Sequence, residues 1–223
     1  MEHFHRDIPG WFTFPRLYRR AVENSPSDGT LVEVGSWMGK SVIYLAVEAV
    51  NSNTEQRIFA VDTWGDHVAV TTGETFDGEA TYQSYLEHVT PVAHRIETLR
   101  MRSTDAAATF EDSSCDFVFI DASHEYRDVR GDLAAWYPKV RPGGVLAGHD
   151  YHWPGVSRAV RDFATANGLK RPRKTELCWV MEKGRESRTR RQRLSDLLYW
   201  PWDAAYLLAG RLRYRHLVRR RRH

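Results

Sequence analysis

Five polar side chains that could do acid–base or metal chemistry follow two apolar segments. Asp121 and His124 come after the apolar run 116–120, and His149, Asp150 and His152 come after the run 145–148. Neighbouring strands of a parallel sheet bring their carboxyl ends to one edge, so we expect these side chains to converge. Two nearby carboxylates disfavour both being charged unless a cation lies between them, and Mg²⁺ takes carboxylate oxygens. The alternative, two helix caps beside surface histidines, fits this combination less well.

A glycine turn lies in the segment 30–41, which reads TLVEVGSWMGKS. The pattern predicts a buried strand, a tight turn and a helix N-terminus, where α/β proteins bind nucleotide-like ligands. The spacing from Gly35 to Gly39 is one residue too short for a P-loop, and Trp37 occupies the place of the second glycine of GxGxxG. Glu33 would repel a pyrophosphate and attract a cation. The turn therefore favours a sulfonium or amino-acid ligand over a nucleoside triphosphate.

A second acid, Asp62, ends the apolar run 57–62 and lies 27 residues after Gly35. In dinucleotide folds an acid about 20 residues after the glycine motif binds ribose hydroxyls. The polar loop before residue 57 accounts for the longer spacing. We therefore predict that Asp62 binds ribose, with a helix cap as the alternative.

The elements that must position these residues alternate along the chain. Apolar runs predict strands over residues 31–34, 57–62, 95–99, 116–121, 145–150 and 177–182, with amphipathic helical segments between them. This order predicts an α/β fold with a doubly wound, mostly parallel sheet. Residues 1–29 form a predicted helical cap, which either roofs a ligand pocket or covers the sheet edge. Residues 63–81 are polar and predict a lid-like loop.

Length and composition suit one α/β domain, residues 30–182, between the cap and a tail over 183–223. The chain has no apolar run of about 18 residues and no secretion signal at its start. Cys115 and Cys178 show no metal or disulfide spacing, so we expect reduced core cysteines and a cytoplasmic protein.

The tail is strongly basic and the rest of the chain is acidic. Residues 183–223 hold thirteen Lys/Arg and three acids, a net charge of +10, and the whole chain is +3, which leaves about −7 for residues 1–182. An acidic body disfavours a nucleic-acid substrate. The tryptophans and arginines of the tail fit an anionic membrane surface, with the protein peripheral to the inner membrane. A homo-oligomer contact, a nucleic-acid patch and a solvated tail without a partner remain alternatives.

Four motifs in order resemble the class I S-adenosylmethionine-dependent methyltransferases: EVGSWMGKS, AVDTW, DFVFIDASHEY and PGGVLAGHDY. The resemblance covers about residues 8–182 and is strongest to macrocin-type O-methyltransferases and cephalosporin-hydroxylase-like proteins. It implies a Rossmann-like sheet of seven strands in which 177–182 alone is reversed. It also implies metal-assisted methyl transfer to a hydroxyl of a small molecule, such as a sugar or glycosylated metabolite. A metal-independent N- or O-methyltransferase and a non-catalytic cofactor-binding protein are the alternatives.

The resemblance assigns roles to individual positions. The methionine part of the cofactor would contact the glycine turn, at Glu33, Gly35, Ser36, Trp37, Gly39 and Ser41. Asp62 would hold the ribose hydroxyls, with Thr63 and Trp64 beside it, and Ser103 and Thr104 would lie near the adenine. Asp121 is a further predicted cofactor-binding residue.

The resemblance also implies a metal site at the ends of the later strands. Asp121 and Asp150 match the metal ligands of metal-dependent relatives. His149 stands where those relatives have an acid, so it either binds the ion, which favours softer metals, or leaves the ion weakly held or absent. His124 is the preferred general base because an unperturbed histidine titrates at about pH 6.5. His149 and His152 are rivals, and Ser123 replaces an acid often seen in relatives.

Overall fold

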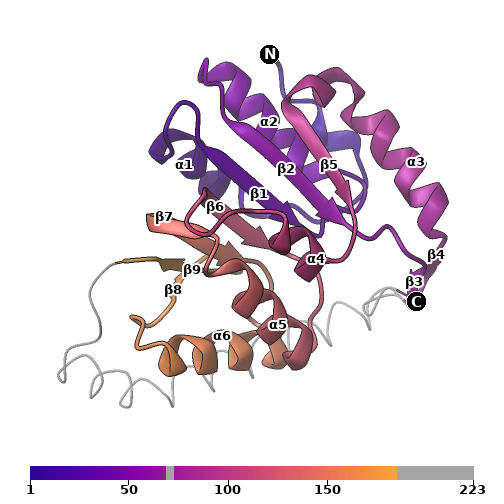
Figure 1. The fold of residues 1–223 in the computed structure, drawn as a ribbon. Helices are drawn as coiled ribbons and strands as arrows, with labels where there is room; N and C mark the ends of the chain where they lie inside the picture. The colour runs from indigo at the N-terminus through magenta and orange to yellow at the C-terminus, as the bar shows by residue number, and fades with distance from the viewer. Residues whose placement is uncertain (69–72, 185–223) are drawn as a thin grey trace.

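The computed structural model describes residues 1–68 and 73–184 (Figure 1). The predicted tail lies outside the described residues beyond Gly184, as does part of the predicted lid. The central sheet has seven strands in the order β5-β2-β1-β6-β7-β9-β8. Their bounds are β1 Thr30–Val34, β2 Arg57–Asp62, β5 Ile96–Arg100, β6 Cys115–Ile120, β7 Val140–Gly148, β8 Arg173–Thr175 and β9 Cys178–Glu182.

Strand direction confirms the predicted architecture. β5, β2, β1, β6 and β7 pair in parallel. β9 pairs antiparallel with both β7 and β8, so β9 alone runs against the other strands. Every residue of β6 is buried, as expected for a central parallel strand covered on both faces.

Helices cover both faces of the sheet (Figure 1). One apolar core contains residues of α1, α2 and α3 together with Leu31 of β1, and the other contains residues of α4, α5 and α6 together with Val32. Leu31 and Val32 lie in different cores because successive strand residues point to opposite faces. The helix bounds are α1 Pro15–Asn24, α2 Lys40–Asn51, α3 Gly78–Val89, α4 Ser103–Ala108, α5 Tyr126–Trp136 and α6 Pro154–Ala166. Among the described residues, no helix has the length and apolar character needed to cross a membrane.

The segment 63–81 departs from the loop we predicted. It contains the short antiparallel pair β3 His67–Val68 and β4 Thr75–Phe76, and α3 already begins at Gly78. The Asp77 side chain accepts a hydrogen bond from the Ala80 amide at 2.7 Å and caps this helix. β8 was also missed, because it is only three residues long and none of them is buried.

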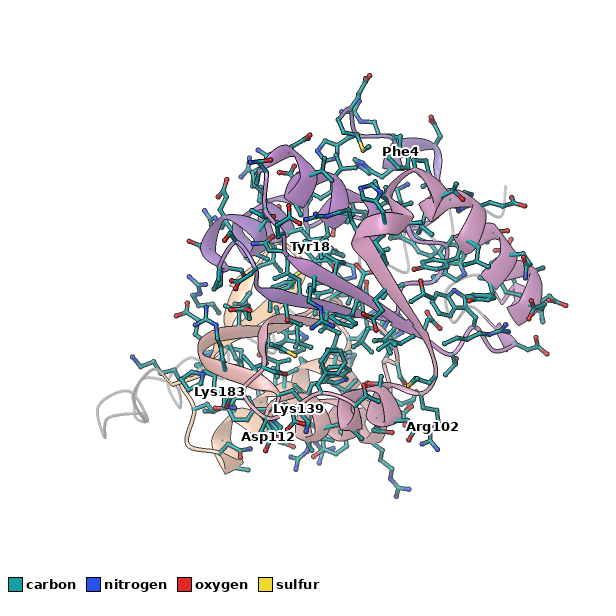
Figure 2. All side chains as sticks on the ribbon, turned by 45° about the horizontal axis from the view of Figure 1, so that its top comes forward. Phe4, Tyr18, Arg102, Asp112, Lys139 and Lys183 are labelled. Atoms are coloured by element: carbon teal, nitrogen blue, oxygen red, sulfur yellow. The ribbon has the colours of Figure 1, made fainter. Side chains whose placement is uncertain are left out.

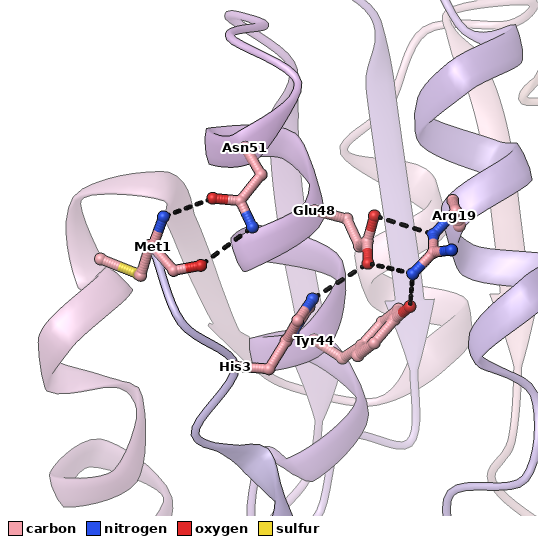
Figure 3. A network of polar contacts seen from close by, with 6 residues as sticks. All are labelled: Met1, His3, Arg19, Tyr44, Glu48 and Asn51. Atoms are coloured by element: carbon pink, nitrogen blue, oxygen red, sulfur yellow. Dashed lines mark hydrogen bonds and ion pairs between the residues drawn. The ribbon is translucent and has the colours of Figure 1, made fainter.

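The N-terminal segment docks on α2 through polar contacts (Figure 3). The Met1 ammonium donates to Asn51 at 2.5 Å, and the Asn51 amide donates back to the Met1 carbonyl. Glu48 contacts both the His3 ring at 3.0 Å and the Arg19 guanidinium of α1. A 3₁₀ turn, η1 His5–Asp7, follows. The predicted cap is thus one helix, α1, preceded by a segment fixed at its start.

Gly35 offers a direct test of how tightly the strand ends are packed. Its φ is +92°, and a Cβ atom there would lie 2.2 Å from the Asp121 carbonyl oxygen. Because backbone must move to relieve that contact, Gly35→Ala should destabilise the protein by about 3 kcal/mol or more in urea unfolding. Gly131→Ala is the matched control, since Gly131 lies in α5 with open space at its Cβ and should become slightly more stable. Equal stability of the two variants would contradict this packing.

Candidate active site

The site lies at the carboxyl edge of four neighbouring strands. Residues at or next to the ends of these strands are in register with their neighbours, Val34 with Val61 and Ile120, and Ile120 with Gly148. The next residues along each chain therefore lie side by side at one edge. β1 leads into α2 on one face and β6 leads into α5 on the other, so the topological switch point of the sheet lies between β1 and β6. The structure thus brings the predicted site residues of β1, β2, β6 and β7 together.

The glycine turn connects β1 to α2 in a left-handed backbone conformation. Gly35 and Gly39 have φ values of +92° and +89°, and Trp37 between them has φ of 42°. A Cβ on Gly39 would lie 3.1 Å from side-chain atoms of both Tyr85 and Val89 of α3. Gly39 is also the N-cap of α2, and no side chain caps this helix. Such a helix start attracts negative groups of a ligand.

Glu33 is fully buried beneath this turn. Its Oε2 accepts a 2.5 Å hydrogen bond from the hydroxyl of Tyr18, a buried residue of α1 (labelled in Figure 2). Its Oε1 has no hydrogen-bond partner, and neither has the buried hydroxyl of Ser36. Burial raises the pKa of Glu33 to about 7, although the Tyr18 hydrogen bond and the nearby hydroxyls of Ser36 and Ser41 oppose the rise. Two buried polar atoms without partners at a glycine turn suit a polar ligand group.

Asp62 ties the turn to the end of β2. Its two carboxylate oxygens accept hydrogen bonds from the backbone amides of Trp37 and Trp64, each at 2.9 Å. The Trp64 indole donates to the Trp37 carbonyl at 2.7 Å. Each oxygen of Asp62 keeps a lone pair with which it could accept a ribose hydroxyl. The Trp64 ring itself is buried and packs against Tyr82 and Tyr85.

Three of the predicted residues form a compact cluster at the ends of β6 and β7. Potential ligand atoms of Asp121, His149 and Asp150 lie within 4.8 Å of one another. The His149 Nδ1 is 3.6 Å from an Asp121 oxygen and 3.5 Å from Asp150 Oδ1. Asp150 has a φ of 54°, which is uncommon for a residue other than glycine. The donor set of two carboxylates and one imidazole suits a divalent metal.

The charges of this cluster depend strongly on one another. Burial alone would lower the pKa of His149, but hydrogen bonds and charges from Asp121 and Asp150 raise it to about 10. Burial alone would raise the pKa of Asp150, but His124 and His149 hold it well below its usual range. Burial raises the pKa of Asp121. Without a bound ion, His149 therefore carries the positive charge between the two acids.

His124 faces the same aspartate from the loop after β6. Its Nε2 is 2.7 Å from Asp150 Oδ2, and its ring stacks on Trp153 with centroids 4.9 Å apart. Burial alone would lower the pKa of His124, but the Asp150 hydrogen bond raises it above its usual value. His152 is more distant, with Nδ1 3.7 Å from Asp150 Oδ1. The Ser123 hydroxyl donates to Asp128 and is engaged locally.

The predicted adenine contacts lie at the start of α4. The Met101 amide donates to the Asp62 carbonyl at 2.9 Å, which places this loop beside β2. The Ser103 hydroxyl accepts a hydrogen bond from the Trp136 indole of α5 at 2.9 Å, and Thr104 is half-buried. Ser41 lies in the first turn of α2, and Thr63 is exposed. The Ser103 hydroxyl is thus engaged by a hydrogen bond within the domain.

Residues from the N-terminal segment enter the site although no motif predicted them. The Thr13 hydroxyl lies 3.1 Å from His149 Nε2, and the Phe14 ring packs on the His149 imidazole with centroids 4.9 Å apart. Tyr18, in α1, donates its hydroxyl hydrogen bond to Glu33. The apolar pattern of residues 11–22 indicated a cap, but it could not show which polar atoms that cap would meet.

Comparison with known proteins identifies the family. Residues 32–151 match the family model described as a methyltransferase domain, so the chain belongs to that family. A relative in Sinorhizobium fredii, the uncharacterized protein y4gI, is 34% identical over 121 residues, which are 54% of this chain and 13% of that protein. The chain therefore spans a small part of this curated relative.

Solved structures show the same fold. The O-methyltransferase NovP matches with a TM-score of 0.61 at 16% identity, over 77% of this chain and 79% of its own. CalS11, a TDP-rhamnose 3′-O-methyltransferase, matches with a TM-score of 0.52 at 18% identity, over 77% of this chain and 78% of its own. A SAM-dependent O-methyltransferase from Thermotoga maritima matches with a TM-score of 0.58 at 10% identity, over 81% of this chain and 69% of its own. The chain has the fold of the S-adenosylmethionine-dependent methyltransferases.

The raised pKa of Glu33 predicts a specific dependence of stability on pH. The folded protein binds this proton more tightly than the unfolded chain, so the Glu33 contribution to stability falls as pH rises from about 4.5 to about 7. Between pH 5 and pH 8, wild type should therefore lose roughly 2 to 3 kcal/mol relative to Glu33→Gln, which cannot ionise. Urea unfolding at both pH values measures this difference. The exposed Glu87→Gln is the control. If the pH-dependent change in unfolding free energy relative to Glu33→Gln is no larger than that relative to this control, ionisation of Glu33 does not destabilise the folded protein.

Proposed function

We propose that this chain methylates a hydroxyl oxygen of a small molecule, using S-adenosylmethionine and a divalent metal. The observation that carries the proposal is the buried Glu33 carboxylate with an unpartnered oxygen, at a glycine turn that directly contacts the Asp121 strand end. A site for a cationic ligand thus adjoins a cluster of acids and histidines. Bound S-adenosylmethionine supplies a methyl group on a positively charged sulfur.

The residues present fit the cofactor. The free oxygen of Glu33 and the free hydroxyl of Ser36 would hold the amino-acid part, whose ammonium matches the carboxylate in charge. The uncapped start of α2 favours the carboxylate of the same part. Asp62 would accept the ribose hydroxyls with its remaining lone pairs. Gly35 and Gly39 keep the turn free of side chains that would fill this space.

The residues at the ends of β6 and β7 fit a metal and a base. Asp121, His149 and Asp150 would hold a divalent ion, which lowers the pKa of a bound hydroxyl when present. His124 would take the hydroxyl proton at Nδ1, because its Nε2 is engaged by Asp150. Stacking on Trp153 fixes the plane of the His124 ring. The acceptor would lie beside these groups, in line with the methyl–sulfur bond.

One observation favours a metal-independent methyltransferase as the second candidate. The Nδ1 atom of His149 lies between the carboxylates of Asp121 and Asp150, where a protonated ring provides the positive charge that an ion would bring. Metal-dependent relatives place an acid at this position, as the resemblance implies. Metal titration therefore distinguishes the two candidates. The proposed contact of the tail with an anionic membrane rests on composition alone, because residues 185–223 lie outside the described part of the chain.

Calorimetric titration with S-adenosylmethionine, with and without Mg²⁺, tests the cofactor site. Wild type should bind the cofactor, and Glu33→Gln should bind it tenfold to a hundredfold more weakly, which is roughly the value of one hydrogen bond to a charged group. The exposed Glu87→Gln should bind as wild type does. Absence of cofactor binding by wild type would overturn the proposal.

Asp150→Ala tests whether the cluster takes part in the chemistry. This change removes the partner of His124 and one proposed metal ligand, so turnover in a mass-monitored acceptor screen should fall by about 100-fold or more while cofactor binding persists. Asp112→Ala is the control, because Asp112 precedes β6 at the opposite edge of the sheet and pairs with Lys139 at 2.7 Å (Figure 2). Unchanged turnover in Asp150→Ala would rule out the metal-assisted mechanism.

A further inference from the structure

We propose that Thr13 is a positioning residue that sets the orientation of the His149 imidazole in the active site. The proposal rests on the proposed function only in that it takes His149 as a member of the metal and acceptor site. It gives the N-terminal segment a part in the chemistry, beyond covering the sheet. Thr13 contacts neither the cofactor nor the acceptor in this proposal and acts through His149.

The two ring nitrogens of His149 face different partners. Nδ1 lies 3.6 Å and 3.5 Å from oxygens of Asp121 and Asp150, and Nε2 lies 3.1 Å from the Thr13 hydroxyl. The Phe14 ring packs on the imidazole at 4.9 Å between centroids. The terminal torsion of histidine is broad and roughly two-fold, so sterics alone do not select whether Nδ1 or the Cδ2 carbon faces the acids. The hydrogen bond between the Thr13 hydroxyl and Nε2 selects the observed orientation, because a turned ring would leave buried Nε2 without this partner.

Thr13 can do this because the chain on both sides of it is fixed. Phe14 is fully buried in the core, and Gly10 lies so close to the Trp37 indole that a Cβ there would be 3.0 Å from it. The Lys40 ammonium, at the first residue of α2, donates to the Ile8 carbonyl at 2.7 Å. The N-terminal segment therefore contacts the glycine turn at one point and His149 at another. Thr13 and His149 are 136 residues apart in the chain, so only the tertiary fold produces this contact.

The partner of the remote nitrogen matters for a ligating histidine. Hydrogen bonding at that nitrogen fixes the tautomer and ring direction, and loss of such a partner costs 10-fold to 100-fold in metal affinity. This hydrogen bond needs the hydroxyl of Thr13. The rest of the side chain matters less, because Thr13 is exposed and its methyl group is not packed in the core. Valine at this position keeps the shape and removes the hydroxyl, and serine keeps the hydroxyl.

Co²⁺ is the probe for the test, because its visible spectrum reports the ligand set. In the full-length protein, Thr13→Val should bind Co²⁺ at least about tenfold more weakly than wild type and with a changed spectrum. Thr13→Ser should restore both the Co²⁺ affinity and the spectrum. In each variant the affinity for S-adenosylmethionine should change by less than about twofold, because the cofactor site is unaltered. The control is Thr90→Val, which removes a hydroxyl that donates to the Leu86 carbonyl on the surface. Wild-type Co²⁺ affinity and spectrum in Thr13→Val would overturn the proposal.

A metal-free measurement separates this proposal from the proposed function. In ¹⁵N-histidine NMR spectra without metal, Thr13→Val should shift the ring nitrogens of His149, assigned with His149→Gln, and leave the other histidines in place. Unshifted His149 signals would overturn the positioning role even if the enzyme binds metal. Shifted signals in a protein that binds no Co²⁺ would support the positioning role and contradict the metal-assisted mechanism. Failure of wild type to bind S-adenosylmethionine would overturn the proposed function, but it would not change what the His149 signals show about Thr13.

Discussion

The active site depends on a carboxylate held in the centre of the sheet. Burying an ionisable group without full hydrogen bonding costs free energy, and Glu33 has only one of its two oxygens bonded. The residues paired with Glu33 on the neighbouring strands, Ala60 and Phe119, are apolar and give its second oxygen no partner. The unfavourable placement makes sense if a cationic ligand supplies the missing partner. The Tyr18 hydroxyl fixes the other carboxylate oxygen by its hydrogen bond.

The N-terminal segment connects the two halves of the site. Its polar contacts begin on α2, where Met1 pairs with Asn51 and Glu48 holds His3 (Figure 3). They end at the strand tips, where Thr13 contacts His149. Between them, Lys40 binds the segment at the first residue of α2. The elements that would bind the cofactor and those that would activate the acceptor are therefore braced by one stretch of chain. In this arrangement the cap belongs to the site as much as the sheet does.

Charge balance distinguishes this site from one built of acids alone. Asp121 and Asp150 share a single histidine, His149, and Asp150 also holds His124. A protonated imidazole and a metal ion would compete for the same place between the carboxylates. In the proposed mechanism, His149 in the place of an acid would reduce the need for a metal. His124 remains oriented by Asp150 in either case.

The sequence by itself determined the sheet and the row of residues at its edge. Apolar runs and glycine spacing are local signals, and register in a parallel sheet then brings Gly35, Asp62, Asp121 and His149 together. The sequence could not show the start of α3 at Gly78 or the short strand β8, whose signals are a single cap and three residues without apolar pattern. Only the tertiary structure decided that Tyr18 meets Glu33 and that Thr13 meets His149. Those contacts join residues far apart in the chain, and their geometry comes from how the cap packs on the sheet, which no local pattern encodes.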